Sequence, residues 1–181
     1  MHRLKEQYNQ EVVPAMQKKF GFKNKMAVPR LEKVILNVGI SAGRNDEKFQ
    51  NLVERTLTRI SGQKPVFTKA RLSVSSFKIR EGNIVGAKVT IRGKRMEEFL
   101  EKLIHITLPR IRDFRGISPK SVDKNGNLTI GFKEHLAFPE IDTAELELIH
   151  GLEIVITTTA KNKEQGLELF KLIKMPFKKT S

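Results

Sequence analysis

Five cations lie between Gly62 and Gly82, in the stretch GQKPVFTKARLSVSSFKIREG, against a single acid, Glu81. Lys and Arg side chains at this density can neutralise phosphates and release their counterions. The stretch contains Lys64, Lys69, Arg71, Ser73, Ser75, Ser76, Phe77, Lys78 and Arg80. It is either a solvated loop that happens to be basic or a surface that binds a negatively charged partner.

A second basic stretch, PRIRDFRG at residues 109–116, offers similar chemistry. Arg110, Arg112, Phe114 and Arg115 surround one acid, Asp113. Proline and glycine bound the stretch, so a loop is expected. Guanidinium groups bind phosphates and also stack on bases. The alternative is an internal ion pair between an arginine and Asp113 that holds the loop in shape.

The composition of the whole chain favours an anionic partner. The 181 residues include 34 Lys and Arg against 20 Asp and Glu, a net charge of +14. A folded chain usually tolerates such an excess because a polyanion neutralises it. The absence of cysteine excludes disulfides, thiolate zinc sites and a cysteine nucleophile. No apolar run approaches the roughly 20 residues of a membrane span, and the first ten residues lack the apolar run of a signal peptide. We therefore expect a cytoplasmic chain with no cofactor, no metal and no membrane partner.

One motif has the form of a catalytic site. Residues 39–43, Gly-Ile-Ser-Ala-Gly, match the G-x-S-x-G nucleophile elbow and lie between an expected strand and helix. A hydrolase of that type needs a large parallel sheet and a histidine and an acid that converge on the serine. Because His105, His135 and His150 are scattered in the sequence, we interpret Ser41 as part of a tight turn and expect no enzymatic activity.

Hydrophobic periodicity predicts an α+β fold. A two-residue period predicts strands at 31–40 and 84–92 and shorter strands near 65–68, 128–132 and 152–156. Apolar stripes predict helices at 4–20 with a kink at Pro14, from a cap at Asn45 or Asp46 to Gly62, from 96 to just before Pro109, and after a cap at Asn162. We expect a mainly antiparallel sheet with helices packed on one face and the other face open. The chain should form a single domain, residues 1–181, with long loops at 69–83 and 109–126.

Two strands determine what the open face carries. Alternation places Val34, Leu36, Val38, Ala87, Val89 and Ile91 toward the core, and Lys33, Asn37, Lys88, Thr90 and Arg92 on the other side. If the two strands share one sheet, these polar residues and the cations of 62–82 form one cationic face. The chain has no DNA-binding motif and no aromatic residues for stacking on the strands, so folded RNA bound by backbone shape is expected. An ordinary solvated sheet face is the alternative.

Residues 134–160 run against the basic trend. They contain no Lys or Arg, and their acids are Glu134, Glu140, Asp142, Glu145, Glu147 and Glu153. We do not expect such a segment to touch RNA. It is either simply solvated or a contact surface for a basic protein.

Several stretches resemble a known family. GQKPVFTKARLSVSSFKIREG, PRIRDFRG, LNVG at 36–39, VTIRG at 89–93 and TTAKNKEQG with MPF near the end are similar to the bacterial large-subunit ribosomal protein that binds 5S ribosomal RNA, the L-five family. The resemblance spans essentially the whole chain. It implies a non-enzymatic, rRNA-binding component of a ribonucleoprotein that serves translation, located in the cytoplasmic ribosome at the central protuberance of the large subunit.

The resemblance also implies binding sites. Asn37, Gln63 and Thr90 match the polar positions of the family's 5S rRNA-binding face. With the neighbouring cations, the expected 5S rRNA site is Lys33, Asn37, Gln63, Lys64, Lys69, Arg71, Lys88, Thr90 and Arg92. The family's basic loop reaches toward the P-site tRNA, and here it carries Ser73, Ser75, Ser76, Phe77, Lys78 and Arg80. The loop with Arg110, Arg112, Phe114 and Arg115 lies either near large-subunit rRNA or near the bridge to a small-subunit head protein.

The chain departs from the family pattern at a few positions. His150 stands where a cation is common, which makes the acidic segment sharper here, and Ser75 and Ser76 replace smaller residues. The alternative function is a generic basic RNA-binding chaperone, which would bind many RNAs with similar strength.

Overall fold

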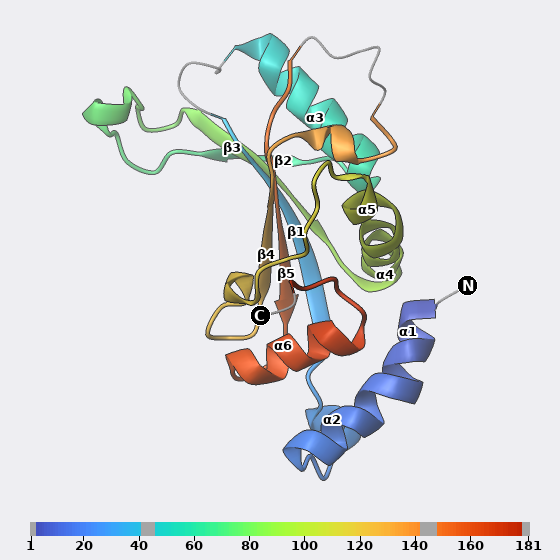
Figure 1. Ribbon diagram of the computed structural model, residues 1–181. Coiled ribbons are helices and arrows are strands. Elements are labelled where there is room, and N and C mark those ends of the chain that lie inside the picture. The colour runs from blue at the N-terminus through green and yellow to red at the C-terminus, as the bar shows by residue number, and fades with distance from the viewer. Residues whose placement is uncertain (1–2, 41–45, 142–147, 179–181) are drawn as a thin grey trace. The chain divides into compact units, whose positions relative to one another are not determined.

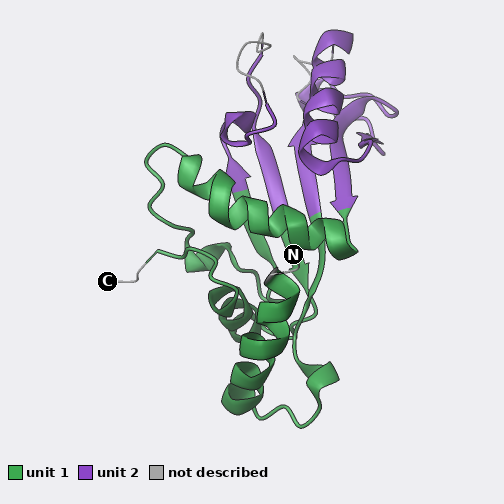
Figure 2. Ribbon diagram, turned by 90° about the vertical axis from the view of Figure 1, so that its right-hand side faces the viewer, with its two compact units in different colours: residues 1–34, 91–130, 155–181 green, residues 35–90, 131–154 purple. Residues whose placement is uncertain are grey.

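The computed structural model describes residues 3–40, 46–141 and 148–178 (Figure 1). The chain separates into two compact units, each assembled from several segments (Figure 2). Unit 1 comprises residues 1–34, 91–130 and 155–181, and unit 2 comprises residues 35–90 and 131–154. The sequence-based expectation of a single domain stays a prediction.

Five strands form an antiparallel sheet in the order β2-β3-β1-β5-β4. Their bounds are Leu31–Gly39 for β1, Val66–Lys69 for β2, Ile84–Ile91 for β3, Leu128–Phe132 for β4 and Leu152–Thr158 for β5. The α+β class and all five expected strands are confirmed. Alternating apolar and polar residues form strands here because the sheet buries the side chains of one face and leaves those of the other face exposed.

Helix α3, Glu47–Ser61, is the main helix of unit 2 and runs along the strands of that unit (Figure 2). It begins at Asp46, whose carboxylate accepts a hydrogen bond from the Phe49 N–H at 2.7 Å. It ends at Gly62, which has φ +66° and donates its N–H to the Thr58 carbonyl at 2.8 Å. Asp46 and Gly62 thus act as expected, and Asn45 lies outside the described residues. The expected stripe is buried at Phe49, Val53, Leu57 and Ile60.

The β2–β3 hairpin of unit 2 continues into an ordered loop. Val74 and Ile79 exchange two backbone hydrogen bonds of 2.9 and 3.1 Å, and a short 3₁₀ turn at Ser75–Phe77 closes them. Nearer the strands, the Ser73 hydroxyl accepts the Glu81 N–H at 2.9 Å. The long loop expected after β2 is therefore a hairpin extension whose own hydrogen bonds define its shape.

Two prolines of unit 1 lie just after π-helical turns. The N-terminal helix runs as α1, Arg3–Gln7, a π-helical turn at Tyr8–Val12, and α2, Val13–Phe20. The later helix runs as α4, Gly93–Lys102, a π-helical turn at Leu103–Thr107, and α5, Leu108–Arg110. Pro14 and Pro109 each occupy the first turn of the segment that follows. A proline has no N–H to donate to the carbonyl four residues earlier, and its ring clashes with that carbonyl. The wider π-helical turn moves the carbonyl away from the ring and so removes the clash. The kink expected at Pro14 is thus a π-helical turn just before the proline. The expectation that the helix from residue 96 ends just before Pro109 is wrong, because α5 includes that proline.

Helix α6, Lys163–Leu172, begins with the expected cap. The Asn162 Oδ1 atom accepts the Gln165 N–H at 2.9 Å, and Gln165 Oε1 accepts the N–H of Lys161 at 3.1 Å. The helix also contacts the Asn125-Gly126 turn before β4, because Gly166 lies directly against Gly126. A Cβ added to Gly166 would overlap the Gly126 Cα, so α6 can pack here only without a side chain at residue 166.

We expect Gly166→Ala to destabilise the fold by about 1–3 kcal/mol, although alanine favours helices, because overlap with backbone cannot be relieved by a rotamer change. Urea unfolding measures this difference. Gly131→Ala is the matched control, since a Cβ there meets nothing within 4 Å, and its stability should be unchanged or slightly raised. Equal stabilities for Gly166→Ala and the parent chain would contradict the packing argument.

Candidate nucleic-acid interface

Unit 2 presents one sheet face away from its buried side, here called the open face. The register Val66↔Lys88 and Thr68↔Gly86 aligns β2 with β3. Lys88 and Thr90 are exposed and Asn37 is half-buried, while their strand neighbours Leu36, Val38, Ala87 and Val89 are buried. The open face consists of Ile35, Asn37, Gly39, Val66, Thr68, Ile84, Gly86, Lys88, Thr90, Gly131 and Glu153. The expected orientation of Asn37, Lys88 and Thr90 is thus observed within unit 2.

The open face contains the side-chain amide of Asn37, which is hydrogen-bonded to Glu153 and lies beside Gly86. Asn37 donates its Nδ2 to the Glu153 carboxylate at 3.3 Å. Its Oδ1 atom lies on the side of Gly86, where an added Cβ would come within 3.9 Å of it. That same Cβ would come within 3.0 Å of Thr68 Oγ1 and the Val38 carbonyl oxygen. Because residue 86 has no side chain, the open face is shallow beside the Asn37 oxygen, which is a hydrogen-bond acceptor.

The expectation of a strongly cationic face across the strands at 31–40 and 84–92 stays a prediction, because the open face is only the part of that face that lies in unit 2. Among the described residues of the open face, Lys88 is the sole cation, and Glu153 is a carboxylate on the same side. Lys64 instead lies near Glu54 of α3, with Nζ and Oε1 3.4 Å apart. Lys33 and Arg92 belong to unit 1, so the open face as described does not include them. Alternation along the strands predicted on which side Asn37, Lys88 and Thr90 lie. It could not predict the positions of cations that belong to the segments between the strands.

Three further residues of the expected RNA site lie where β2 begins and ends. Gln63 is half-buried just before the strand, and its backbone exchanges hydrogen bonds with the Ser61 hydroxyl at 3.1 and 3.2 Å. Lys69 and Arg71 are exposed at the other end, after an irregularity in the register at Thr68 and Lys69. These residues border the open face rather than lying on it.

The basic loop presents apolar and cationic side chains together. Phe77 is 68% exposed and Leu72 is 75% exposed, which is unusual for large hydrophobic residues. Lys78 adopts φ +53° at the tip, and Arg80 follows at an exposed position. Ser73 is used in the internal bond to Glu81, whereas Ser75 and Ser76 form the exposed 3₁₀ turn. An ordered loop with these groups suits contact with a nucleotide base and its phosphate.

The arginine loop in unit 1 is joined to the C-terminal segment. Ile117 N–H donates to the Pro176 carbonyl at 2.8 Å, and Lys178 N–H donates to the Ile117 carbonyl at 2.9 Å. The exposed guanidinium groups are those of Arg110, Arg112 and Arg115, and Phe114 is half-buried. Within the described part of the chain, none of these three arginines forms an ion pair with Asp113. The alternative of an internal Arg–Asp clamp is therefore not observed.

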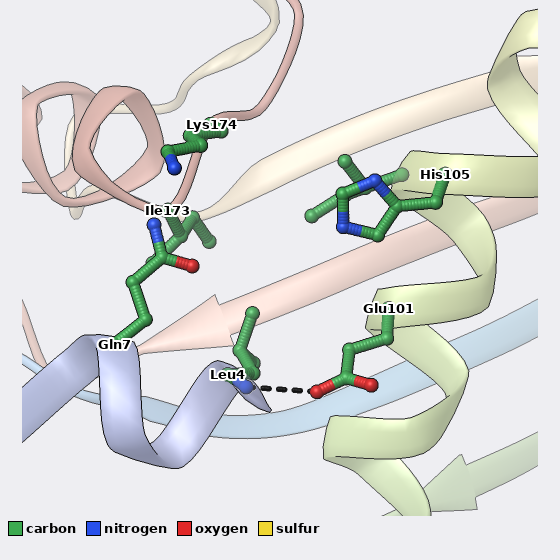
Figure 3. A pocket seen from close by; sticks show the side chains of 7 residues that line it. Leu4, Gln7, Glu101, His105, Ile173 and Lys174 are labelled. Atoms are coloured by element: carbon green, nitrogen blue, oxygen red, sulfur yellow. Dashed lines mark hydrogen bonds between the residues drawn. The ribbon is translucent and has the colours of Figure 1, made fainter. Parts of the chain in front are cut away.

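The residues with catalytic potential do not converge. Ser41 lies outside the described residues. A small pocket of unit 1 brings Glu101 near His105 (Figure 3). Glu101 Oε1 there accepts the Leu4 N–H at 2.8 Å, so this carboxylate caps the first turn of α1. No cluster of potential metal ligands occurs among the described residues, and no helix in that part of the chain is both long and apolar enough to cross a membrane.

Comparison with known proteins gives one consistent result. Residues 24–80 match the family model for ribosomal protein L5, and residues 84–177 match the model for the C-terminus of the same ribosomal family. The chain belongs to the ribosomal protein L5 family. Relatives named large ribosomal subunit protein uL5 include one from Halothermothrix orenii, 53% identical over 174 residues, which are 96% of this chain and 97% of the relative. Another, from Carboxydothermus hydrogenoformans, is 49% identical over 177 residues, or 98% and 99% of the two chains.

Membership of the ribosomal L5 family confirms that the chain is a structural, non-enzymatic protein. The alternation along residues 31–40 placed Ile35 and Gly39 on the face of Asn37, as observed, but sequence reasoning missed other parts of the open face, namely Val66, Thr68, Ile84, Gly86, Gly131 and Glu153. The two-residue period could have placed Glu153 on it. The positions of Thr68 and Gly86 depend on the register of the hairpin, which no local pattern specifies.

Two of the three histidines that are scattered in the sequence lie together in the structure. His135 and His150 in unit 2 stack with ring centroids 4.1 Å apart, and both are buried. The ring of Phe49 meets His150 edge-on at 6.1 Å. His135 Nδ1 lies 3.2 Å from the His150 carbonyl oxygen and 3.3 Å from its backbone nitrogen. His150 is therefore a core residue here and does not act as an exposed substitute for the family's cation.

We expect the buried His135 to make folding pH-dependent. Burial lowers the pKa of His135, and the hydrogen bond to His150 and the charge of Glu134 oppose that shift only in part. The unfolded chain therefore takes up a proton first as the pH falls below about 6.5, and the folded state loses stability by up to about 1.4 kcal/mol per pH unit.

Urea unfolding between pH 8 and pH 5 tests this expectation. His135→Gln should flatten the fall in stability, whatever its effect at neutral pH. His105→Gln, which changes an exposed histidine, should keep the parent slope. Parallel pH profiles for all three proteins would exclude the buried ring as the cause.

Proposed function

We propose that this chain binds 5S rRNA through the open face of unit 2 and helps attach that RNA in the central protuberance of the large ribosomal subunit. Its relatives are named large ribosomal subunit proteins, and the chain is accordingly a structural constituent of that subunit. Bacterial ribosomes lie in the cytoplasm, which agrees with the location expected from the sequence. The observation that carries the finer proposal is the half-buried Asn37, held by Glu153, on the same face as exposed Thr90 and Lys88.

The groups on the open face are suited to reading folded RNA. The Asn37 oxygen accepts hydrogen bonds, so its partner must be a donor, such as a 2′-hydroxyl or a base amino group. Thr90 can donate or accept, and Lys88 can neutralise a phosphate. The glycines allow the RNA backbone to approach the sheet closely. Gln63, Lys64, Lys69, Arg71, Lys33 and Arg92 belong to the same proposed site.

The basic loop is proposed to contact the P-site tRNA. Its apolar tip residue Phe77 and the cations Lys78 and Arg80 are exposed on a hairpin extension with its own hydrogen bonds. Such a loop can meet a second RNA while the open face is occupied. The serines at 73, 75 and 76 contribute to the frame and surface of the same contact.

The arginine loop is proposed to bind large-subunit rRNA. Arg110, Arg112 and Arg115 are exposed and form no ion pair among the described residues, so their donors remain available to phosphates. Contact with a small-subunit head protein is then left to the acidic segment 134–160, part of which, residues 142–147, lies outside the described residues.

A generic basic RNA chaperone is the rival function. Such a protein would rely on charge and bind many RNAs alike. The near balance of charge on the open face argues against that mode for unit 2. Competition between 5S rRNA and bulk RNA separates the two functions, since only the proposed one predicts a strong preference for 5S rRNA.

We expect Asn37→Ala and Thr90→Val to weaken 5S rRNA binding by about 1–3 kcal/mol each, because a buried RNA group would lose its hydrogen-bond partner. Filter binding at constant salt concentration measures the dissociation constants. Thr58→Val, on the exposed side of α3, is the control and should bind like the parent. Unchanged dissociation constants for both open-face variants would remove these residues from the site.

The double variant Lys78→Gln/Arg80→Gln should bind 5S rRNA nearly as well as the parent but release P-site tRNA faster once built into ribosomes. The reason is that both cations lie on the loop, beyond the open face. Lys120→Gln/Lys124→Gln removes the same charge elsewhere and should leave tRNA release unchanged. A large loss of 5S rRNA affinity in the loop variant would refute the division between loop and face.

A further inference from the structure

The positive charge of the chain is distributed very unevenly between the two units. Unit 1 contains 23 Lys and Arg against 10 Asp and Glu, a net charge of +13. Unit 2 contains 11 Lys and Arg against 10 Asp and Glu, a net charge of +1. The unit with the open face therefore carries almost none of the excess. Electrostatic attraction to RNA should come mainly from unit 1.

One long stretch of unit 1, between Glu11 and Glu32, contains no acidic residue and is rich in cations. It contains Lys18, Lys19, Lys23, Lys25 and Arg30. Four of these belong to one short segment, residues 18–26, which we call the lysine turn. It covers the end of α2, a glycine and the first two residues of the 3₁₀ turn at Lys25–Ala27.

Hydrogen bonds give the lysine turn a defined shape. Gly21 has φ +71° and donates its N–H to the Gln17 carbonyl at 2.9 Å, and Gln17 Nε2 donates to the Phe22 carbonyl at 3.2 Å. The Asn24 side chain accepts the Met26 N–H at 2.9 Å. The lysines are thus attached to an ordered backbone, so little backbone entropy is lost when a partner binds.

Three lysines of the turn have no carboxylate partner within the described part of the chain: Lys18, Lys23 and Lys25. Lys19 differs, because its Nζ lies 2.6 Å from Glu168 of α6. Favourable interaction with the end of the α2 dipole explains a lysine at position 18. It does not explain Lys23 and Lys25, which follow the helix.

Apolar groups accompany the free cations. Phe20 and Phe22 are half-buried, with ring centroids 6.1 Å apart, and Met26 is 80% exposed. Cations beside accessible rings are typical of surfaces that contact the backbone and the bases of a nucleic acid. An acidic protein would also be attracted, but the family is ribosomal and RNA is the polyanion that such proteins meet.

We propose that the lysine turn is a second RNA-binding surface, separate from the open face, that binds the phosphates of a folded rRNA segment. In this arrangement the open face supplies the preference for its RNA, and unit 1 supplies a large share of the salt-dependent affinity.

The test compares two triple variants of the full chain with equal net charge. Lys18→Gln/Lys23→Gln/Lys25→Gln removes the free cations of the lysine turn. Lys5→Gln/Lys94→Gln/Lys163→Gln removes three exposed lysines of unit 1 that lie near Glu6, Glu98 and Glu164. Both are surface changes, so circular dichroism should show parent-like folding. Binding to 5S rRNA and to protein-free large-subunit rRNA is then measured from about 50 to 300 mM salt.

The lysine-turn variant should lose at least tenfold affinity for one of the two RNAs, and its slope of log affinity against log salt should fall by about two to three, near 0.9 per lost phosphate contact. The control triple should change affinity less than threefold. Equal effects of the two triples, or no effect on either RNA, would overturn the proposal. Thr90→Val should leave the slope unchanged, so failure of the open-face proposal would be recognised separately.

A second measurement uses the absence of cysteine from the chain. Met26→Cys would carry a tethered iron chelate, and the modified protein would be assembled into large subunits. Hydroxyl radicals from residue 26 should cleave rRNA at a discrete site. No rRNA cleavage, or loss of an acidic protein from subunits built with the lysine-turn variant while both RNA affinities stay intact, would refute RNA as the partner.

Discussion

The two-residue alternation of the strands in unit 2 is the constraint on which the proposed interface depends. Leu36, Val38, Ala87 and Val89 point toward the buried side of that unit, and this leaves Asn37, Lys88 and Thr90 no choice but the opposite side. A slip of one residue in either strand would bury the polar groups and expose the apolar ones. The burial of these apolar side chains contributes more free energy than the hydrogen bonds of the polar ones. Hydrophobic burial therefore determines where the polar side chains lie.

The two proposals assign recognition of the RNA and electrostatic attraction to different parts of the chain. Counterion release is insensitive to base sequence, and a strongly cationic open face would therefore hold many RNAs. A nearly neutral face with an amide, a hydroxyl and one ammonium group depends instead on hydrogen-bond geometry. The excess charge of +13 in unit 1 can supply affinity without weakening that preference. Such a division would account for a chain of net charge +14 with one cation among the described open-face residues of unit 2.

Much of the fold follows from local patterns. The strands, the caps at Asp46 and Asn162 and the stop at Gly62 depend on residues close in sequence, so they could be predicted. The π-helical turns before Pro14 and Pro109 could not, because a proline signals that a helix must adjust but not how. The stacking of His135 on His150 was also missed, since it depends on the path of the chain between them.

The candidate site was predicted in part for the same reason. Asn37, Lys88 and Thr90 follow from alternation, which is a local rule. The assignment of Lys64 to the RNA surface rests on its place in a basic run and stays a prediction, whereas its contact with Glu54 of α3 could not be read from the sequence. A run of like charges in a sequence does not show which side of a sheet each member faces. The acidic Glu153 was set aside for the opposite reason, although its strand places it beside Asn37.

The carboxylate of Glu153 has a function on a surface proposed to meet phosphates. It would repel them, which would lower affinity, but it also accepts the Asn37 amide hydrogen and so determines that the amide nitrogen faces Glu153 and the amide oxygen faces away from it. Without the carboxylate the amide could rotate by half a turn and present a donor in place of an acceptor. An RNA group that donates a hydrogen bond would then lose its partner in a share of the molecules. A buried hydrogen-bond donor without a partner costs more free energy than one surface charge contact contributes. The repulsion between Glu153 and the phosphates is therefore offset by better discrimination between RNAs.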